Sequence, residues 1–460
     1  WALLLAALAA AAAGQQEDLA ATAELLAADD ECSAGEGPQC SLSALQLRAA
    51  SAKSAAPPAP APGFACSGGA DLGPVVGAAG KGIALDDTTF KGCAGSIPHL
   101  WPNTHEPVTS LRLFKAWDPE WPAEHRQAAW ASIVDYVHRN GVKVLLGTEI
   151  TCNETLDAQS WAWAKELLGL LGPSHVMGLA IGNELELLFR MGNRRPVAPV
   201  TPECVNRLWA GGYVLRAFRS TVADFDAMGF SAVPVTSVLG GYSLAGSPFV
   251  DTHSSGILTF LKAVTRSYGR RFVFTFNFYP YFDTNMHLDH DHYHCHGALG
   301  GATCWRHHCF MPSIVRAAKS RVSALAPGSR FWLGETGWSS PLAPSLASQM
   351  SRCPAWSATS TLRSFYQGFL HAGDLGVDHV FYFTVRDSQV FGVPEHFGLI
   401  SSCSSAQCKL GAGSSLAQAD EGSQALQEAE EEAQEAGEFT PERLAAYAEH
   451  LLAKAGGRGA

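Results

Sequence analysis

The segment "FWLGETGWSS" (residues 331–340) runs from an apolar stretch straight into a charged side chain. Phe331, Trp332 and Leu333 indicate a fully buried strand, because parallel strands covered on both faces are continuously apolar. Glu335 follows at the point where that strand would end. In parallel α/β folds the chemistry is carried at the carboxyl ends of the strands. The segment therefore predicts a parallel sheet with a functional carboxylate at a strand exit.

Other apolar stretches of strand length recur along the chain, separated by stretches long enough for a helix. One of these, residues 123–141, has a basic last turn and ends at Gly141, a typical helix C-cap. Eight such strands alternating with helices predict a closed (β/α)₈ TIM barrel rather than an open sheet. The expected strands are residues 81–86, 110–116, 143–150, 176–184, 232–239, 272–280, 330–336 and 379–387.

The composition changes on both sides of this barrel region, which we place at residues 66–410. Residues 1–14 resemble the core and cleavage region of a signal peptide, with an alanine-rich helix as the alternative. Residues 15–65 read as a disordered Ala/Pro-rich linker. Residues 411–460 predict an acidic tail that ends in a helix. We therefore expect a secreted protein, extracellular or in a cell wall.

The formal net charge of −11 is concentrated in the two end segments. Residues 1–65 hold seven acidic and two basic side chains, and residues 411–460 hold ten and three, which leaves the barrel region near +1. A nearly neutral body argues against a nucleic-acid partner and suits a neutral ligand. The apolar N-terminal stretch is too short to span a bilayer, so we expect no stable membrane insertion.

The chain has twelve cysteines, none of them in a CxxC pair. An even number agrees with an oxidising destination, and the absence of CxxC pairs disfavours a zinc knuckle. The sequence does not fix the pairings. Cys403 with Cys408, or pairs among Cys295, Cys304 and Cys309, would close short loops.

A second carboxylate, Glu184, ends the fourth expected strand and directly follows Asn183. Strands four and seven lie nearly opposite each other in an eight-stranded barrel, so Glu184 and Glu335 can approach across its mouth. Two opposed carboxylates among aromatic side chains indicate glycoside hydrolysis, one as acid and one as nucleophile. Trp338 would stack on the apolar face of a sugar ring.

Four motifs together resemble glycoside hydrolase family 17, the β-1,3-glucanases and related transferases. They are "AIGNE" (180–184), "FNFYPYF" (276–282), "LGETGWSS" (333–340) and "EHFGLI" (395–400), in the order and spacing of that family. The resemblance covers about residues 80–400.

The resemblance implies a retaining O-glycosyl hydrolase of the glucan 1,3-β-glucosidase type that acts on β-glucan without metal or organic cofactor. Glu184 would be the general acid/base and Glu335 the nucleophile, with Asn183 on the sugar 2-hydroxyl and Tyr279 beside the nucleophile. The implied substrate-binding residues are Asn183, Asn277, Tyr279, Tyr281, Trp338, Asp387 and Glu395.

Some positions depart from the family pattern. Ser339 replaces a familiar proline, and Asp86 and Asp87 stand where the family commonly has tyrosine and glycine. The lysine that plant members carry between the strand-eight acids is missing, with Gln389 and Val390 in that region. These departures concern the sugar subsites and leave the catalytic pair intact.

Other functions fit parts of the sequence. A β-1,3-glucanosyltransferase would use the same site, and a non-catalytic carbohydrate-binding wall protein would use the barrel alone. The histidine-rich residues 287–309 also permit a metal-handling protein, although we expect a disulfide-braced insertion without metal. Glu149 is either a further cleft acid or a salt-bridged rim residue, and we expect the latter. We expect a monomer.

Overall fold

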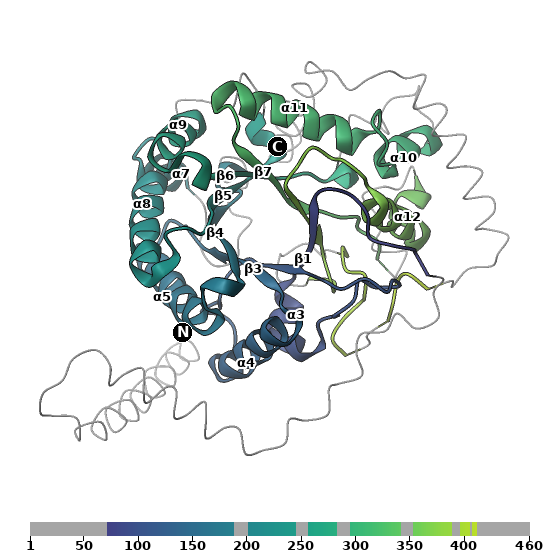
Figure 1. Ribbon diagram of the computed structural model, residues 1–460, viewed down its shortest axis with the longest axis horizontal. Coiled ribbons are helices and arrows are strands. Elements are labelled where there is room, and N and C mark those ends of the chain that lie inside the picture. Colours follow the sequence, from purple (N-terminus) through teal and green to yellow (C-terminus); the bar gives the residue numbers. More distant parts are fainter. Residues whose placement is uncertain are drawn as a thin grey trace, which may run out of the picture. The chain divides into compact units, whose positions relative to one another are not determined.

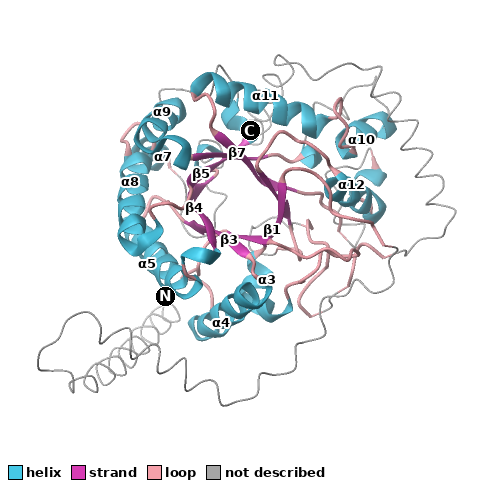
Figure 2. Cartoon of the chain, in the orientation of Figure 1, coloured by secondary structure: helices cyan, strands magenta, loops and turns pink. Residues whose placement is uncertain are grey.

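A closed barrel of eight parallel strands forms the centre of the described chain (Figures 1 and 2). Each strand pairs with its sequence neighbours, and β8 pairs with β1, so the predicted (β/α)₈ barrel is confirmed. The computed structural model describes residues 71–187, 201–244, 256–282, 295–341, 353–388, 396–404 and 407–411.

The strands lie where the apolar stretches predict them, and most of their residues are buried. Several predicted strands extend one to four residues beyond the observed carboxyl end, because the residues at the strand exits already belong to loops. The strands are β1 Gly80–Leu85, β2 Ser110–Leu113, β3 Lys143–Thr148, β4 Val176–Asn183, β5 Val235–Gly240, β6 Val273–Asn277, β7 Arg330–Thr336 and β8 His379–Phe383.

Helices surround the barrel (Figure 2). The helix predicted at residues 123–141 is confirmed, with Gly141 as a left-handed C-cap at φ 63°. The α-helices are α3 Asp87–Cys93, α4 Ala123–Asn140, α5 Glu154–Leu171, α7 Pro202–Leu208, α8 Tyr213–Phe225, α9 Ile257–Tyr268, α10 Cys295–Thr303, α11 Phe310–Leu325 and α12 Thr359–His371.

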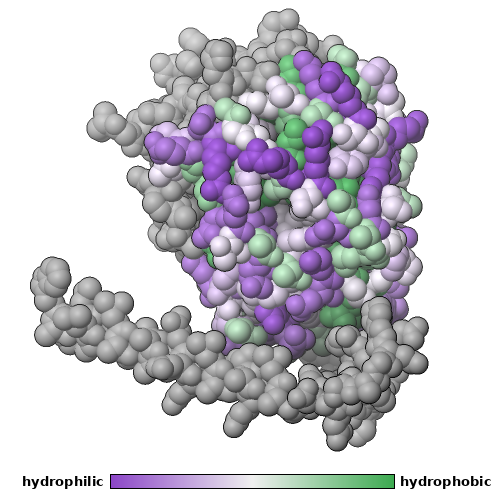
Figure 3. Space-filling view, turned by 90° about the vertical axis from the view of Figure 1, so that its left-hand side faces the viewer, coloured by the Kyte–Doolittle hydropathy of each residue, from purple (hydrophilic) through white to green (hydrophobic). Residues whose placement is uncertain are grey.

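The outer helices are amphipathic. In α8 the buried side chains include Val214, Phe218, Val222 and Phe225, a spacing that places them on one helix face. Figure 3 shows the outside of the molecule on the α5 and α8 side, where hydrophilic side chains predominate with apolar ones scattered between them. The helices therefore cover the barrel with apolar faces and present polar faces outward.

Several predictions fall on residues outside the described part. These are the signal-peptide-like residues 1–14, the linker at 15–65 and the acidic tail beyond residue 411. Among the described helices, none combines the length and apolar character needed to cross a bilayer.

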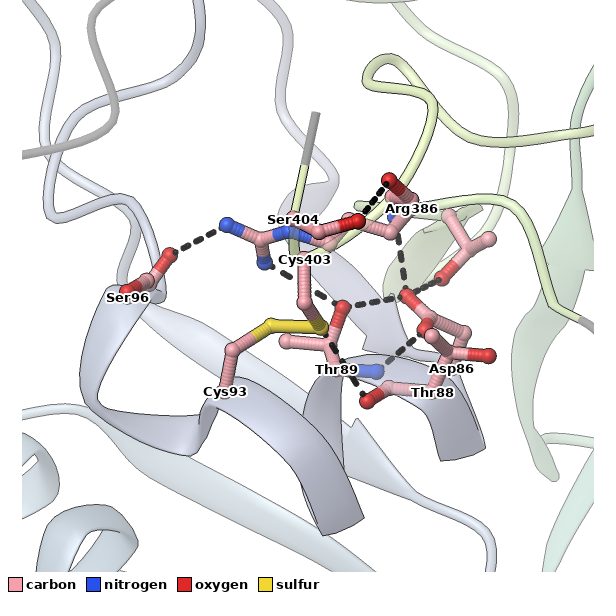
Figure 4. Close-up of a disulfide and its surroundings, with 10 residues drawn as sticks. Asp86, Thr88, Thr89, Cys93, Ser96, Arg386, Cys403 and Ser404 are labelled. Atoms are coloured by element: carbon pink, nitrogen blue, oxygen red, sulfur yellow. Dashed lines mark hydrogen bonds between the residues drawn. A yellow bond between two sulfur atoms is a disulfide. The ribbon is translucent and has the colours of Figure 1, made fainter. Parts of the chain in front are cut away.

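Disulfides join distant parts of the described chain. The predicted short loop between Cys304 and Cys309 is confirmed. The alternative pairing of Cys403 with Cys408 is wrong, because Cys403 is bonded to Cys93, the last residue of α3 (Figure 4). The pairs whose two cysteines both lie in the described part are Cys93–Cys403, Cys152–Cys204, Cys295–Cys353 and Cys304–Cys309.

The buried carboxylate of Asp86 closes the seam between β1 and β8 (Figure 4). It caps α3 by accepting hydrogen bonds from the backbone N–H of Thr89 at 2.6 Å and from the Thr89 hydroxyl at 2.8 Å. From the β8 side it accepts the backbone N–H of Arg386 at 2.9 Å and the hydroxyl of Thr384 at 3.2 Å. One side chain thus satisfies donors that follow the first and the last strand of the barrel.

Replacing Asp86 with alanine should destabilise the protein by about 2–4 kcal/mol, because it removes a helix cap and leaves buried donors without an acceptor. Chemical unfolding followed by circular dichroism measures this loss. Asp135→Ala, on the exposed face of α4, is the control and should change stability by no more than about 0.5 kcal/mol. Equal stability of the two variants would contradict the role of Asp86.

Candidate active site

Glu335 lies at the carboxyl end of β7, buried among hydrogen-bond donors. Its Oε1 accepts hydrogen bonds from Nη1 of Arg112 at 2.7 Å and from Nδ2 of Asn277 at 2.6 Å. Its Oε2 accepts the hydroxyl of Tyr279 at 2.5 Å. Three donors from β2, from the end of β6 and from the residues after it fix this carboxylate in one orientation.

Asn277 connects the two candidate catalytic carboxylates. Besides Glu335, its Nδ2 donates to Oε1 of Glu184 at 2.9 Å. Because both oxygens lie within hydrogen-bond reach of one nitrogen, they are at most about 5.5 Å apart. Carboxyl groups of retaining glycosidases are about 5–5.5 Å apart, and those of inverting enzymes about 6.5–9.5 Å.

Glu184 directly follows β4 in an unusual backbone conformation. Its φ is +50°, a left-handed value that costs a non-glycine residue about 1–2 kcal/mol. Its backbone N–H is held by the carbonyl of Val238 on β5 at 2.8 Å, and the register between β4 and β5 shifts between Ala180 and Asn183. The irregularity turns the chain so that the Glu184 side chain meets Asn277.

Arg112, on β2, is a site residue that the sequence analysis missed. It is buried and ion-paired with Glu335. Its Nη2 donates to Oδ1 of Asn183 at 2.7 Å, and its guanidinium lies over the ring of Phe114, 4.5 Å from the centroid. An arginine inside the apolar strand "SLRLF" was the available signal, because a buried charge needs a partner.

Aromatic rings adjoin Glu335. Tyr279 packs edge-on against Phe397, with ring centroids 5.2 Å apart, and against Phe282 at 5.6 Å. Phe282 is 40% exposed, whereas most large apolar side chains of the described part are buried. Phe114 and Phe383 extend the cluster, with centroids 5.8 Å apart. A partly exposed aromatic surface beside Glu335 suits the apolar face of a sugar ring.

Trp338 and Tyr281 are placed differently from the expectation. Trp338 is 0% exposed, its indole N–H donates to the carbonyl of Trp356 at 2.6 Å, and its ring packs against Tyr281. The Tyr281 hydroxyl pairs with Ser357, and the residue is buried. Neither ring offers a free face, so the expected stacking of Trp338 on a sugar is corrected to packing beneath the site.

Asp387 is already engaged by protein groups. Its Oδ1 accepts Nζ of Lys409 at 2.5 Å and the backbone N–H of Gly398 at 2.9 Å, and His396 lies 3.3 Å from Oδ2. The cation beside this acid thus comes from a later segment of the chain. These partners give Asp387 a supporting position. The other acid of this group, Glu395, lies outside the described residues.

Glu186 is a second carboxyl group close to Glu184, in the short helical turn Leu185–Leu187. It is 0% exposed, its Oε1 accepts the backbone N–H of Gly240, and its Oε2 has no hydrogen-bond partner among the residues that the structure describes. Burial, and secondarily the nearby charge of Glu184, raise the pKa of Glu186 well above its ordinary value. Burial of this carboxyl group thus favours its protonated form.

Glu186→Gln should stabilise the protein increasingly as the pH rises. The raised pKa means that the folded state holds the proton while the unfolded chain releases it, so wild-type stability falls above the ordinary glutamate pKa of about 4.3. Thermal melting at pH 4, 6 and 8 measures the difference between variant and wild type. A difference that stays constant with pH would contradict the buried neutral form, and Glu166→Gln on exposed α5 is the matched control.

Glu149, just after β3, is a rim residue as expected. Its Oε1 forms an ion pair with Nζ of Lys115 at 2.8 Å. The salt-bridged alternative for this acid is therefore confirmed.

One group of potential metal ligands occurs in the described part of the chain. The donor atoms of Cys304, His308 and Cys309 lie within 4.8 Å of one another. The two sulfurs are joined in a disulfide, which leaves no thiolate for a metal. The alternating histidines at 290, 292 and 294 lie outside the described residues, so the expected absence of metal stays a prediction.

Comparison with known proteins gives similarity of fold. No family model matches the sequence, and no curated protein matches it. Similar solved structures include a β-1,3-glucanase and pollen allergen of Cryptomeria japonica, at 15% identity over 64% of this chain and 87% of that one, with a TM-score of 0.42. A Rhizomucor miehei β-1,3-glucanosyltransferase in complex with laminaritriose has 15% identity over 67% and 88%, with a TM-score of 0.38.

A family 1 β-glucosidase from Thermotoga maritima is similar at 10% identity over 72% of this chain and 94% of that one, with a TM-score of 0.43. Similarity this distant does not decide which reaction this chain performs. Membership of family 17 remains a prediction from the four motifs.

Proposed function

We propose that this protein is a retaining glycoside hydrolase that cleaves β-1,3-glucan, with Glu335 as nucleophile and Glu184 as general acid/base. One observation carries the proposal. The shared nitrogen of Asn277 keeps the two Oε1 atoms within about 5.5 Å, the separation that suits a covalent intermediate rather than an interposed water.

The reaction takes place in two displacements. Glu335 attacks the anomeric carbon while the bond to the leaving oxygen breaks, and Glu184 gives its proton to that oxygen. Water then enters, Glu184 takes a proton from it, and the new hydroxyl displaces Glu335 from the anomeric carbon. Two inversions return the original configuration.

The surroundings of the two glutamates support this assignment of roles. Glu335 is buried and accepts hydrogen bonds from Arg112, Asn277 and Tyr279. A nucleophile held in one orientation in this way can attack the anomeric carbon along one direction. Glu184 is more exposed and lies after an irregular strand end, where a leaving group and then water can reach it. The Asn183 oxygen faces Arg112, which leaves its amide N–H groups to bind a sugar hydroxyl.

The substrate assignment rests on charge, on aromatic surface and on the four motifs. A barrel region near neutral charge and a partly exposed Phe282 packed against Tyr279 suit an uncharged polysaccharide. A glucanosyltransferase would use the same atoms and differ only in intercepting the intermediate with a sugar hydroxyl.

The test is hydrolysis of a soluble β-1,3-glucan by the full chain, with product anomers followed by proton NMR. We expect the β-anomer to form first and to mutarotate afterwards. Glu335→Ala and Glu184→Gln should each lower kcat at least about a thousandfold, because each removes one of the two displacement partners.

Glu166→Gln is the control and should retain wild-type activity. Products longer than the starting oligosaccharide would identify a transferase with the same site. An α-anomer appearing first would overturn the retaining mechanism. Wild-type protein that binds β-glucan without cleaving it would overturn the enzyme assignment in favour of a binding protein.

A further inference from the structure

Glu186 lies two residues after the proposed general acid and takes no part in the two displacements. Its side chain is 0% exposed, so a substrate does not reach it. Its Oε1 accepts the backbone N–H of Gly240, the last residue of β5, whereas its Oε2 is buried without a hydrogen-bond partner in the described part of the chain. An unpaired buried oxygen is unfavourable for folding, so stability alone does not account for a carboxyl group at this position.

Gly240 connects Glu186 to the proposed catalytic pair. In the register of β5 with β6, Gly240 is opposite Asn277, whose amide nitrogen donates to both catalytic carboxylates. The carbonyl of Gly240 accepts the hydroxyl of the buried Ser243 at 2.8 Å. Glu186 and Ser243 therefore hold both backbone polar groups of the residue that is level with Asn277.

Contacts with β5 also lie on both sides of the Glu184 side chain. The backbone N–H of Glu184 donates to the carbonyl of Val238 at 2.8 Å, and two residues later Glu186 accepts the N–H of Gly240. Between these contacts Glu184 has its left-handed φ of +50°. A non-glycine residue keeps such a conformation only where the surrounding contacts enforce it. The hydrogen bond of Glu186 to β5 is one of the contacts that do so.

The nucleophile depends less on this contact than the acid does. Glu335 also accepts hydrogen bonds from Arg112 and Tyr279, which lie on β2 and just after β6. Loss of the contact between Glu186 and Gly240 would therefore displace Glu184 more than Glu335.

The carboxyl group of Glu186 acts here as a hydrogen-bond acceptor rather than as a charge. Burial, and secondarily the charge of Glu184, raise its pKa and favour the protonated form. A protonated carboxyl group still accepts through its carbonyl oxygen, as the amide of glutamine does. Glutamine is therefore the replacement that retains the contact with Gly240, and methionine, of similar length and flexible, is the one that removes it.

We infer that Glu186 is a positioning residue for the general acid. By holding the end of β5 through Gly240, it keeps the Glu184 carboxyl group where that group can protonate the leaving oxygen. The inference rests on the proposed function, to which it adds a residue that touches neither the sugar nor the reacting atoms. Loss of Glu186 should therefore affect chiefly those substrates whose leaving group needs a proton.

The experiment compares kcat/KM for two substrates that differ in this need. The leaving oxygen of a β-1,3-linked hexasaccharide must be protonated, whereas the phenolate of 2,4-dinitrophenyl β-laminaribioside leaves without a proton. In Glu186→Met the value should fall about a hundredfold on the hexasaccharide, as for a displaced catalytic group, and less than about threefold on the dinitrophenyl substrate. Glu186→Gln should stay within about threefold of wild type on both. Glu166→Met, on the exposed face of α5, is the control and should match wild type.

An equal loss on both substrates would indicate a merely structural role and overturn the inference. Full activity of Glu186→Met on the hexasaccharide would overturn it too, as would a Glu186→Gln variant as impaired as Glu186→Met. Thermal melting shows whether Glu186→Met folds. If it does not, Glu186→Asp decides by the same comparison, because its side chain is one methylene shorter and falls short of Gly240.

Failure of the proposed function is distinguishable from failure of the positioning role. Wild type that cleaves neither substrate overturns the hydrolase assignment, and amide hydrogen exchange at Gly240 then tests the contact alone. Exchange about tenfold faster in Glu186→Met than in wild type and in Glu186→Gln supports the contact. Equal exchange in the three proteins overturns it.

Discussion

The amide nitrogen of Asn277 sets the geometry on which the candidate site depends. β4 and β7 do not touch each other in the barrel, because β5 and β6 lie between them. Asn277 ends β6 and donates to the carboxylates that follow β4 and end β7. The distance between the two acids is therefore set by one side chain at the end of β6, a strand hydrogen-bonded to its neighbours on both sides.

Arg112 completes this constraint from the other side of the barrel. It contacts Glu335, the carbonyl of Gly334 and the Asn183 oxygen, so β2, β4 and β7 are joined through one guanidinium. A buried ion pair is stabilising only where its remaining donors are satisfied. Here those donors also orient the residues proposed to hold the sugar, so the same contacts serve folding and chemistry.

Buried carboxyl groups near the barrel mouth fall into two kinds. Asp86 and Glu335 are surrounded by donors, and their positions follow from folding and from the proposed chemistry. Glu186 is buried with a single backbone donor to its carboxyl group, and burial and the nearby charge of Glu184 raise its pKa well above the ordinary value. Such a group lowers stability as the pH rises, so its position beside Glu184 points to a role other than folding.

Local signals in the sequence predict the barrel and its two opposed glutamates, because a buried parallel strand and its polar exit lie within ten residues of each other. The side-chain contacts are not predictable in this way. The cation beside Asp387 comes from Lys409, the cysteine bonded to Cys93 lies 310 positions away, and Trp338 is covered by Tyr281 and Trp356. Each depends on segments brought together only by the closed barrel.

The most direct test of the account is to trap the covalent intermediate. A 2-deoxy-2-fluoro β-glucosyl fluoride reacts with a retaining nucleophile and turns over slowly, and peptide mass spectrometry locates the attached sugar. The account predicts one fluoroglucosyl group on the peptide that contains Glu335, and none in Glu335→Ala. A fluoroglucosyl group on Glu184 would contradict the assignment of Glu335 as the nucleophile. So would a protein that binds the reagent but carries the label on neither glutamate.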